Sequence, residues 1–224
     1  MIKTIARLAC CGFALLAIAG QNANADVVYD FLTDDGGFVN SSDNLANPWT
    51  WTNGTGWTID GVDGNGQGQN NGYLTSELLV VTANGGVDLS FDHQFGFETD
   101  WDGGAIWTSV NGGAFTYLDA SAFSAGGYNS VALLGNHVNA GLLGFNDISG
   151  SPLGSAASLG TFNAGDTLQI RFTGGWDEFV VGPGQPEWSL TGATVTNATA
   201  VPEPGTGLVL VFSGAMAFVG RRKR

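Results

Sequence analysis

The body of the chain, from Asp26 to about Thr199, consists of many short apolar runs separated by Gly, Asn, Asp and Ser, with no long run of helical periodicity. Of the 224 residues, 36 are Gly. Short runs between turn-forming residues are typical of an all-β domain. The chain also has 7 Trp, 14 Phe and 4 Tyr, enough aromatic surface to bury a core, so the composition argues against disorder throughout.

Apolar and polar side chains alternate most clearly over residues 87–97. One parity is apolar and the other polar, which predicts a strand with one buried and one solvated face. We expect further strands at residues 27–31, 56–59, 73–81, 105–110, 114–118, 130–134, 142–145, 168–173 and 188–196. About ten strands in one domain are too many for a single open sheet, so we predict two packed antiparallel sheets, a β-sandwich.

Two local features refine this prediction. Asn111, Gly112 and Gly113 join segments 105–110 and 114–118. Because these residues accept positive φ angles, the two segments should form a hairpin. In the last segment the parity of the apolar residues changes around Gly192, which predicts a bulge there.

Charge is distributed unevenly along the chain. Seven Lys and Arg oppose 20 Asp and Glu, for a net charge of −13. Arg171 is the only basic residue outside the two terminal segments, so residues 26–220 carry 1 − 20 = −19 charges. Such a body repels anionic polymers and anionic membrane surfaces, which argues against a nucleic-acid-binding function.

The first 25 residues have the features of a cleaved secretory signal peptide. A short basic region precedes an apolar run over residues 12–20, and Ala23 and Ala25 supply the small residues that signal peptidase requires. An uncleaved anchor is the alternative, although the apolar run is short for one. Both cysteines of the chain lie in this segment, so we expect a mature domain without disulfides or Cys-rich zinc sites.

The last 24 residues combine three elements in order. The triplet Pro202, Glu203 and Pro204 is followed by an apolar run over residues 205–219. A basic cluster then ends the chain, at Arg221, Arg222, Lys223 and Arg224. As a helix the apolar run would rise about 22 Å, less than the roughly 30 Å of a hydrocarbon core. We therefore expect a short transmembrane helix whose basic end stays on the cytoplasmic side.

This tripartite order resembles the PEP-CTERM sorting signal of Gram-negative bacteria that make exopolysaccharide. The resemblance implies that an exosortase, a multipass membrane enzyme, recognises the triplet and removes the tail. The flanking prolines favour an extended, accessible backbone around Glu203. A plain C-terminal anchor with a proline-rich stalk is the alternative. The expected organisation is a signal peptide (1–25), a β-sandwich domain (26–199) and a sorting signal (200–224).

A looser resemblance covers the body. The segment 89–98, the stretch Trp101-Asp-Gly-Gly104 and the stretch Ser109-Val-Asn-Gly-Gly113 resemble the jelly-roll β-sandwich of MAM-like and immune-inhibitor-A-like extracellular domains. That resemblance implies an adhesion or accessory module and not a catalytic one. Together the two resemblances predict a secreted protein of the cell surface or extracellular matrix, transiently anchored in the inner membrane, with exopolysaccharide as a candidate partner.

Motifs for catalysis are scarce in the sequence. There is no Gly-x-Ser-x-Gly and no His-Glu-x-x-His motif, and the only histidines are His93 and His137. His93 has the inward parity of its strand, which favours a hydrogen-bonded core residue, whereas His137 lies in a Gly/Asn-rich loop where we expect it to be solvated. We therefore predict a non-enzymatic protein. The alternative is a polysaccharide hydrolase using two carboxylates from among Glu98, Asp100, Asp102, Asp177, Glu178 and Glu187.

Acidic residues at alternate positions follow the strand 87–97. Glu98, Asp100 and Asp102 would place their carboxylates on one side where the strand ends, and calcium prefers such oxygen ligands. Calcium is therefore the candidate cofactor, and no other is expected. A second acidic cluster, which fails the EF-hand spacing, contains Asp60, Asp63 and Asn65.

Three tryptophans lie close together in the sequence: Trp49, Trp51 and Trp57. On a β surface they would stack on sugar rings, as in a carbohydrate-binding module. The alternative is that they plug the sandwich, since Trp is usually largely buried. A carbohydrate-binding or calcium-dependent adhesion module is thus the alternative to a purely structural surface protein.

Overall fold

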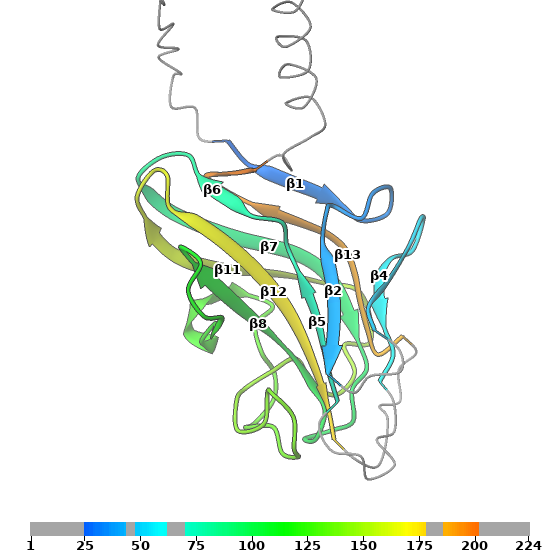
Figure 1. The fold of residues 1–224 in the computed structure, drawn as a ribbon. Coiled ribbons are helices and arrows are strands. Elements are labelled where there is room, and N and C mark those ends of the chain that lie inside the picture. Colours follow the sequence, from blue (N-terminus) through cyan, green and yellow to red (C-terminus); the bar gives the residue numbers. More distant parts are fainter. Residues whose placement is uncertain (1–24, 44–47, 62–69, 178–185, 202–224) are drawn as a thin grey trace, which may run out of the picture.

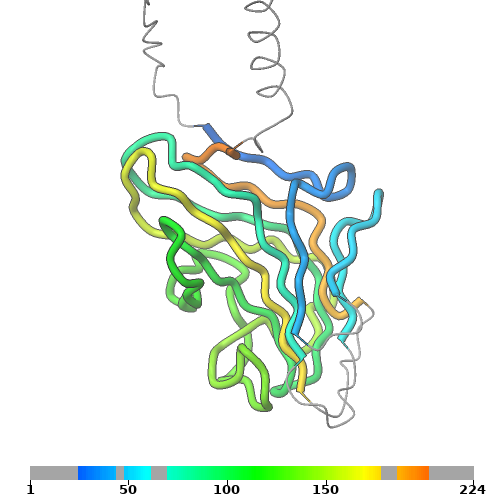
Figure 2. Tube along the Cα trace, viewed as in Figure 1, coloured from blue at the N-terminus to red at the C-terminus, as the bar shows by residue number. Residues whose placement is uncertain are grey.

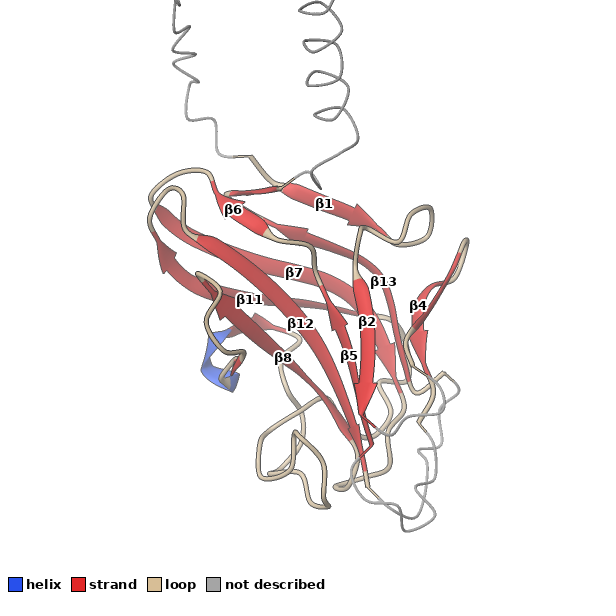
Figure 3. Cartoon of the chain, viewed as in Figure 1, coloured by secondary structure: helices blue, strands red, loops and turns tan. Residues whose placement is uncertain are grey.

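The computed structural model describes residues 25–43, 48–61, 70–177 and 186–201 (Figure 1). Two antiparallel sheets pack face to face as a β-sandwich, which confirms the predicted fold class. Residues 1–24 of the predicted signal peptide and the predicted C-terminal helix lie outside the described residues. Within them, no helix is long and apolar enough to cross a membrane, and the one helical turn is the 3-10 turn η1, Ala120–Ala122 (Figure 3).

The first sheet contains seven strands in which neighbours are antiparallel. Its order is β10 (Phe123–Ala125), β11 (Leu153–Phe162), β7 (Gly85–Phe95), β13 (Trp188–Val195), β4 (Gly56–Ile59) and β3 (Thr50–Thr52), and β1 (Val27–Asp30) also pairs with β13. The central strand β7 alternates between buried and exposed residues along its length, as its sequence predicts.

The second sheet also has seven strands, and β12 is its centre. Its order is β14 (Ala198–Ala200), β6 (Leu79–Val81), β12 (Thr167–Trp176), β5 (Asn70–Thr75) and β2 (Val39–Asp43), with β8 (Gly103–Val110) paired to β12 and β9 (Thr116–Tyr117) paired to β8. The two sheets meet through aromatic rings. Phe91 of β7 and Phe172 of β12 lie edge to face, with 5.2 Å between ring centroids.

The predicted hairpin and bulge are both present. β8 and β9 pair through Trp107 and Tyr117, and the turn between them has positive φ angles at Asn111 (52°) and Gly112 (70°). In β13 the register with β7 shifts between Leu190 and Gly192. Both features follow from local backbone requirements, which is why the sequence predicts them.

Three strand predictions are wrong. Residues 130–134 and 142–145 belong to the long connection between β10 and β11, where Leu133 and Phe145 are buried without being part of a strand. Segment 73–81 is divided into β5 and β6, because Ser76 leaves the ladder and its hydroxyl accepts a hydrogen bond from the Ile170 N–H over 3.0 Å. Apolar content alone therefore identified burial but not strand geometry.

The two ends of the sandwich differ in what they contain (Figure 2). The strands β1 and β14 lie side by side at one end of the sandwich, where the Ala198 N–H donates to the Ala25 carbonyl over 2.8 Å. At the opposite end, β12 ends and β8 begins (Figure 1). The two ends of the described domain therefore lie far from the point where β12 ends and β8 begins.

Candidate metal site

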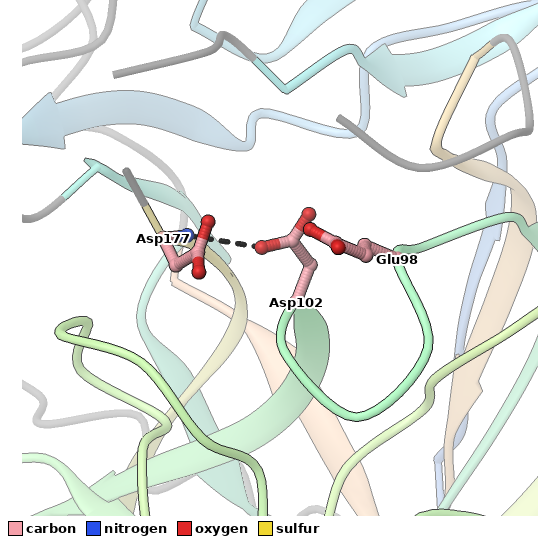
Figure 4. A group of neighbouring side chains, drawn as sticks. All are labelled: Glu98, Asp102 and Asp177. Atoms are coloured by element: carbon pink, nitrogen blue, oxygen red, sulfur yellow. Dashed lines mark hydrogen bonds between the residues drawn. The ribbon is translucent and has the colours of Figure 1, made fainter. Parts of the chain in front are cut away.

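Three acidic side chains converge at the end of the sandwich where β8 begins. Carboxylate oxygens of Glu98, Asp102 and Asp177 all lie within 4.8 Å of one another (Figure 4). Glu98 follows β7, Asp102 directly precedes β8, and Asp177 directly follows β12. Asp102 is fully buried, Asp177 is 7% exposed and Glu98 is half-buried. The group thus draws on two separate segments, the turn between β7 and β8 and the end of β12.

The two oxygens of Asp102 differ in their partners. Oδ1 accepts a hydrogen bond from the main-chain N–H of Asp177 over 2.9 Å, the dashed line in Figure 4. Oδ2 is buried and accepts no hydrogen bond from any residue that the structure describes. Figure 4 shows this second oxygen directed at the carboxylate of Glu98. A buried carboxylate oxygen without a partner is costly, and such groups call for a physical explanation.

The turn that carries Glu98 and Asp102 is held by one buried amide. Asn146 Nδ2 donates to the carbonyl of Glu98 over 2.8 Å and to that of Asp102 over 2.6 Å. Its Oδ1 accepts from the Asp100 N–H over 3.1 Å. Asn146 is 3% exposed, so these bonds form away from water. The turn geometry is therefore fixed by the protein itself.

Two Gly-Gly pairs bring the strands of the site together. Gly103 and Gly104 of β8 lie directly opposite Gly175 and Gly174 of β12. A Cβ atom on Gly104 would meet the ring of Trp188, and one on Gly175 would meet the ring of His137. Glycine is required at these positions because large rings pack against the bare backbone.

Burial and like charges raise the pKa of two acids in the site. Burial raises the pKa of Asp102 to about 8, and the charges of Glu187, Asp177 and Glu98 add to the effect against the opposing hydrogen bond from Asp177. Burial and the charge of Asp177 also raise the pKa of Glu98. At neutral pH and without a cation, the raised pKa therefore favours the protonated form of Asp102.

Arg171, the basic residue of the body, contacts Phe115 and Thr75. The guanidinium of Arg171 lies 3.6 Å from the centroid of the Phe115 ring, and its Nε donates to Thr75 Oγ1 over 3.0 Å. Glu187, a fully buried acid near the cluster, accepts hydrogen bonds from the Gly61 N–H over 2.6 Å and from the indole N–H of Trp176. Hydrogen bonds, and not Arg171, thus hold the carboxylates of Glu187 and Asp102.

Of the three acids predicted to bind calcium, the structure brings Glu98 and Asp102 together, whereas Asp100 lies apart from them. Asp100 adopts a positive φ of 68°, is exposed, and lies outside the cluster, because the chain turns sharply between its neighbours. Asp177 takes its place, brought in by the pairing of β12 with β8. Asp63 and Asn65 of the second predicted cluster, and Glu178, lie outside the described residues.

Both histidines are buried. His93 is a core residue, as its parity predicts: its Nδ1 accepts from the Trp188 indole over 3.1 Å, so its Nε2 donates to Ser155 Oγ over 2.8 Å. Burial lowers its pKa to about 3. The prediction that His137 is solvated is wrong. It is 4% exposed, and its Nε2 donates to the Trp101 carbonyl over 2.7 Å.

The tryptophans proposed to stack on sugars face the core. Trp49 is 1% exposed and lies 5.3 Å from Trp188, centroid to centroid. Trp57 is 4% exposed, and Trp51, which is half-buried, donates from its indole to the Phe31 carbonyl over 2.8 Å. Trp49 and Trp57 therefore lie in the core of the sandwich, and Trp51 packs against it.

Solved structures with some likeness to the chain include two glycoside hydrolases. An exo-β-1,3-galactanase from Phanerochaete chrysosporium with β-1,3-galactotriose is 17% identical, over 76% of this chain and 29% of that one, with a TM-score of 0.28. A GH87 α-1,3-glucanase catalytic domain in complex with nigerose is 11% identical, over 83% and 31%, with a TM-score of 0.27. The chain thus spans about a third of the length of either structure.

No curated protein sequence matches the chain. A family model does match its end. Residues 200–224 fit the model described as the PEP-CTERM protein-sorting motif, and the match includes the Pro-Glu-Pro triplet and the basic cluster. Nearly all of this stretch lies outside the described residues, so the match rests on sequence. The chain therefore ends in a PEP-CTERM protein-sorting motif, which marks it as a secreted protein targeted to the cell envelope.

Proposed function

We propose that the protein is a non-enzymatic component of the cell surface or extracellular polysaccharide matrix of a Gram-negative bacterium. In this proposal signal peptidase removes residues 1–25, and the segment 205–219 holds the chain briefly in the inner membrane. An exosortase then cuts near the triplet at residues 202–204 and releases the β-sandwich. The single observation that carries the proposal is the match of residues 200–224 to the sorting motif.

The arrangement of the domain agrees with such an anchor. β1 and β14 lie at the same end of the sandwich, so the segments that precede and follow the domain start from that end (Figure 1). The carboxylate cluster lies at the other end. While the tail is in the membrane, the cluster would face away from the bilayer. Residues 26–220 also carry 19 net negative charges, which disfavours adsorption to anionic lipid.

The chemistry of the described side chains favours a non-enzymatic function. Both histidines are buried, hydrogen-bonded and have lowered pKa values. Asp102 has the raised pKa expected of a general acid, but it is fully buried, and a general acid must touch the bond that it protonates. These features argue against His93, His137 and Asp102 as groups that contact a polysaccharide substrate.

A calcium-dependent adhesion module is the second candidate, because the carboxylate cluster is a specific feature that a purely structural sandwich does not need. Binding of carbohydrate through the three tryptophans is less well supported, because Trp49 and Trp57 are buried and cannot stack on a sugar ring. A hydrolase is the third. Polysaccharide turnover by the wild-type protein that disappears in Glu98→Gln would contradict the non-enzymatic proposal.

The test is the location and intact mass of the protein in its natural host. We expect the wild-type protein at the cell surface or in the matrix, with a mass that lacks both the first 25 residues and the basic cluster. A chain lacking residues 201–224 should fail to reach the surface by this route. Unchanged display of that chain, or a surface protein that still ends in Arg224, would overturn the sorting proposal.

A further inference from the structure

We infer that Glu98, Asp102 and Asp177 form a binding site for a hard divalent cation, Ca²⁺, at the end of the sandwich opposite β1 and β14. The inference goes beyond the proposed function, because sorting of the chain does not require a cation. It also differs from the sequence-based ligand set, which contained the exposed Asp100 in place of Asp177.

The spacing of the oxygens suits calcium. Ca²⁺ binds oxygen ligands at about 2.3–2.6 Å, so two ligands on opposite sides of the ion are about 4.6–5.2 Å apart. Carboxylate oxygens that all lie within 4.8 Å of one another can therefore reach one ion. The three side chains supply only oxygen atoms, and hard cations prefer oxygen ligands to soft ligands such as sulfur. Backbone carbonyls and water would complete the six to eight ligands that calcium takes.

The partnerless oxygen of Asp102 is an independent indication of a ligand. Asp102 is 0% exposed, and its Oδ2 accepts no hydrogen bond from the described part of the chain. It points toward the carboxylate of Glu98, with Asp177 on the other side of Asp102 (Figure 4). Two neighbouring carboxylates cannot donate to this oxygen once they are ionised. A cation between them would pair with this oxygen and offset the charges of the neighbouring carboxylates.

The protein holds the three side chains in place without the ion. Asn146 fixes the turn between Glu98 and Asp102 through its two donor hydrogens. The Asp177 N–H fixes the orientation of the Asp102 carboxylate through Oδ1, which leaves Oδ2 directed into the site. A site whose ligands are already oriented loses little conformational entropy on binding. The ion would connect the end of β7, the start of β8 and the end of β12.

The experiment uses the purified full chain, treated with a chelator and then freed of it. We expect CaCl₂ to bind with a stoichiometry of one in isothermal titration calorimetry, and saturating CaCl₂ to raise the melting temperature by about 5 °C. Tb³⁺, a calcium substitute, should show emission sensitised by tryptophan. The inference would be overturned if CaCl₂ produced neither a heat of binding nor a change in melting temperature. Tighter binding of MgCl₂ than of CaCl₂ would overturn the assignment of the ion as calcium.

Variants test the ligand set. Asp102→Asn keeps the oxygen that accepts from Asp177 but removes the charge, so we expect calcium affinity to fall by about 100-fold or more. Glu98→Gln, at a half-buried position that tolerates substitution better, should show a similar loss and covers the case in which the Asp102 variant does not fold. The matched control is Asp100→Asn, an exposed acid of the same turn. If Asp100→Asn weakens binding as much as the other two, the ligand set is wrong.

Discussion

The main-chain N–H of Asp177 donates a 2.9 Å hydrogen bond to Oδ1 of Asp102, which ties the end of β12 to the start of β8. These two residues are 75 positions apart in the chain. They meet because Gly103, the residue after Asp102, pairs directly with Gly175, two positions before Asp177. Oδ1 of Asp102 thus has a main-chain hydrogen-bond donor, whereas Oδ2 lies among other acidic side chains.

The stability of the calcium-free protein should fall as the pH rises from about 4 to about 8. Asp102 has a pKa of about 8 in the folded chain, against 3.8 for an ordinary Asp. Between these values the folded state binds a proton that the unfolded state has lost, so the stability gained from that proton is present at low pH and is lost as the pH passes through the folded pKa. Chemical denaturation in a chelator, at intervals across this range, measures the effect.

Asp102→Asn should flatten this dependence, because the amide does not titrate while its oxygen still accepts the bond from Asp177. Asp100→Asn, in the same turn, should leave the slope as it is in the wild type. A slope in the chelated wild-type protein that equals the slope in Asp102→Asn would show that folding does not raise the pKa of Asp102.

His93 should contribute a pH dependence of the opposite sign. Burial lowers its pKa to about 3, so the folded protein keeps it neutral while the unfolded chain takes up a proton below about pH 6.5. Its contribution to stability is therefore full above that value and is lost as the pH falls toward 3. The measurement is denaturation between pH 7 and 5 in the Asp102→Asn background, where the opposing titration is absent.

The comparison variant is His93→Gln, which should unfold about 1–3 kcal/mol more easily at pH 7, because the Trp188 indole loses its acceptor. It should also show a smaller loss of stability on acidification than the parent. The difference between the two slopes reports His93 alone, since His137 is present in both proteins. Equal slopes would mean that His93 is protonated in the folded state or remains accessible to protons.

Asn146→Ala should destabilise the domain by about 2–4 kcal/mol, because it removes three side-chain hydrogen bonds of the turn, including the one to the buried Asp102 carbonyl. Calcium affinity should fall as well, since the turn that orients Glu98 and Asp102 loosens. The control is Thr99→Ala, an exposed residue of that turn whose loss should cost less than about 0.5 kcal/mol. Equal effects of the two variants in urea denaturation would contradict the role of Asn146.

Features governed by local backbone chemistry could be predicted from the sequence. The alternation in β7, the hairpin at Asn111 and the bulge near Gly192 all follow from side-chain parity and from residues that accept positive φ. β11 was missed because its sequence, LGSAASLGTF, is poor in β-branched and aromatic residues. Its pairing with β7 along almost its whole length makes it a strand, and pairing is not a local property.

In the candidate site, too, local sequence could predict some of the residues but not all of them. Glu98 and Asp102 share one turn, so their proximity could be read from spacing, whereas the positive φ of Asp100 turns that residue away from them. Asp177 could be identified only through the pairing of β8 with β12. A signal for that pairing does exist: Asp-Gly-Gly at 102–104 and Gly-Gly-Trp-Asp at 174–177 are mirrored, as glycines that face each other in an antiparallel pair would be.

Gly104→Ala tests the close packing at these glycines. The added Cβ would lie 2.6–2.8 Å from carbon atoms of the Trp188 ring, which is itself fully buried and contacts Trp49 and Phe172. Because the ring has no free space to move into, we expect a loss of about 1–3 kcal/mol in the free energy of unfolding. Gly86→Ala in β7 is the control: a Cβ there meets nothing within 4 Å, and the backbone needs no positive φ. That variant should be neutral or slightly stabilising, since Gly in a strand costs about 0.5–1 kcal/mol relative to Ala. If Gly104→Ala unfolds at the same denaturant concentration as Gly86→Ala, Trp188 does not pack against β8, and the opposed Gly-Gly pairs have no steric role.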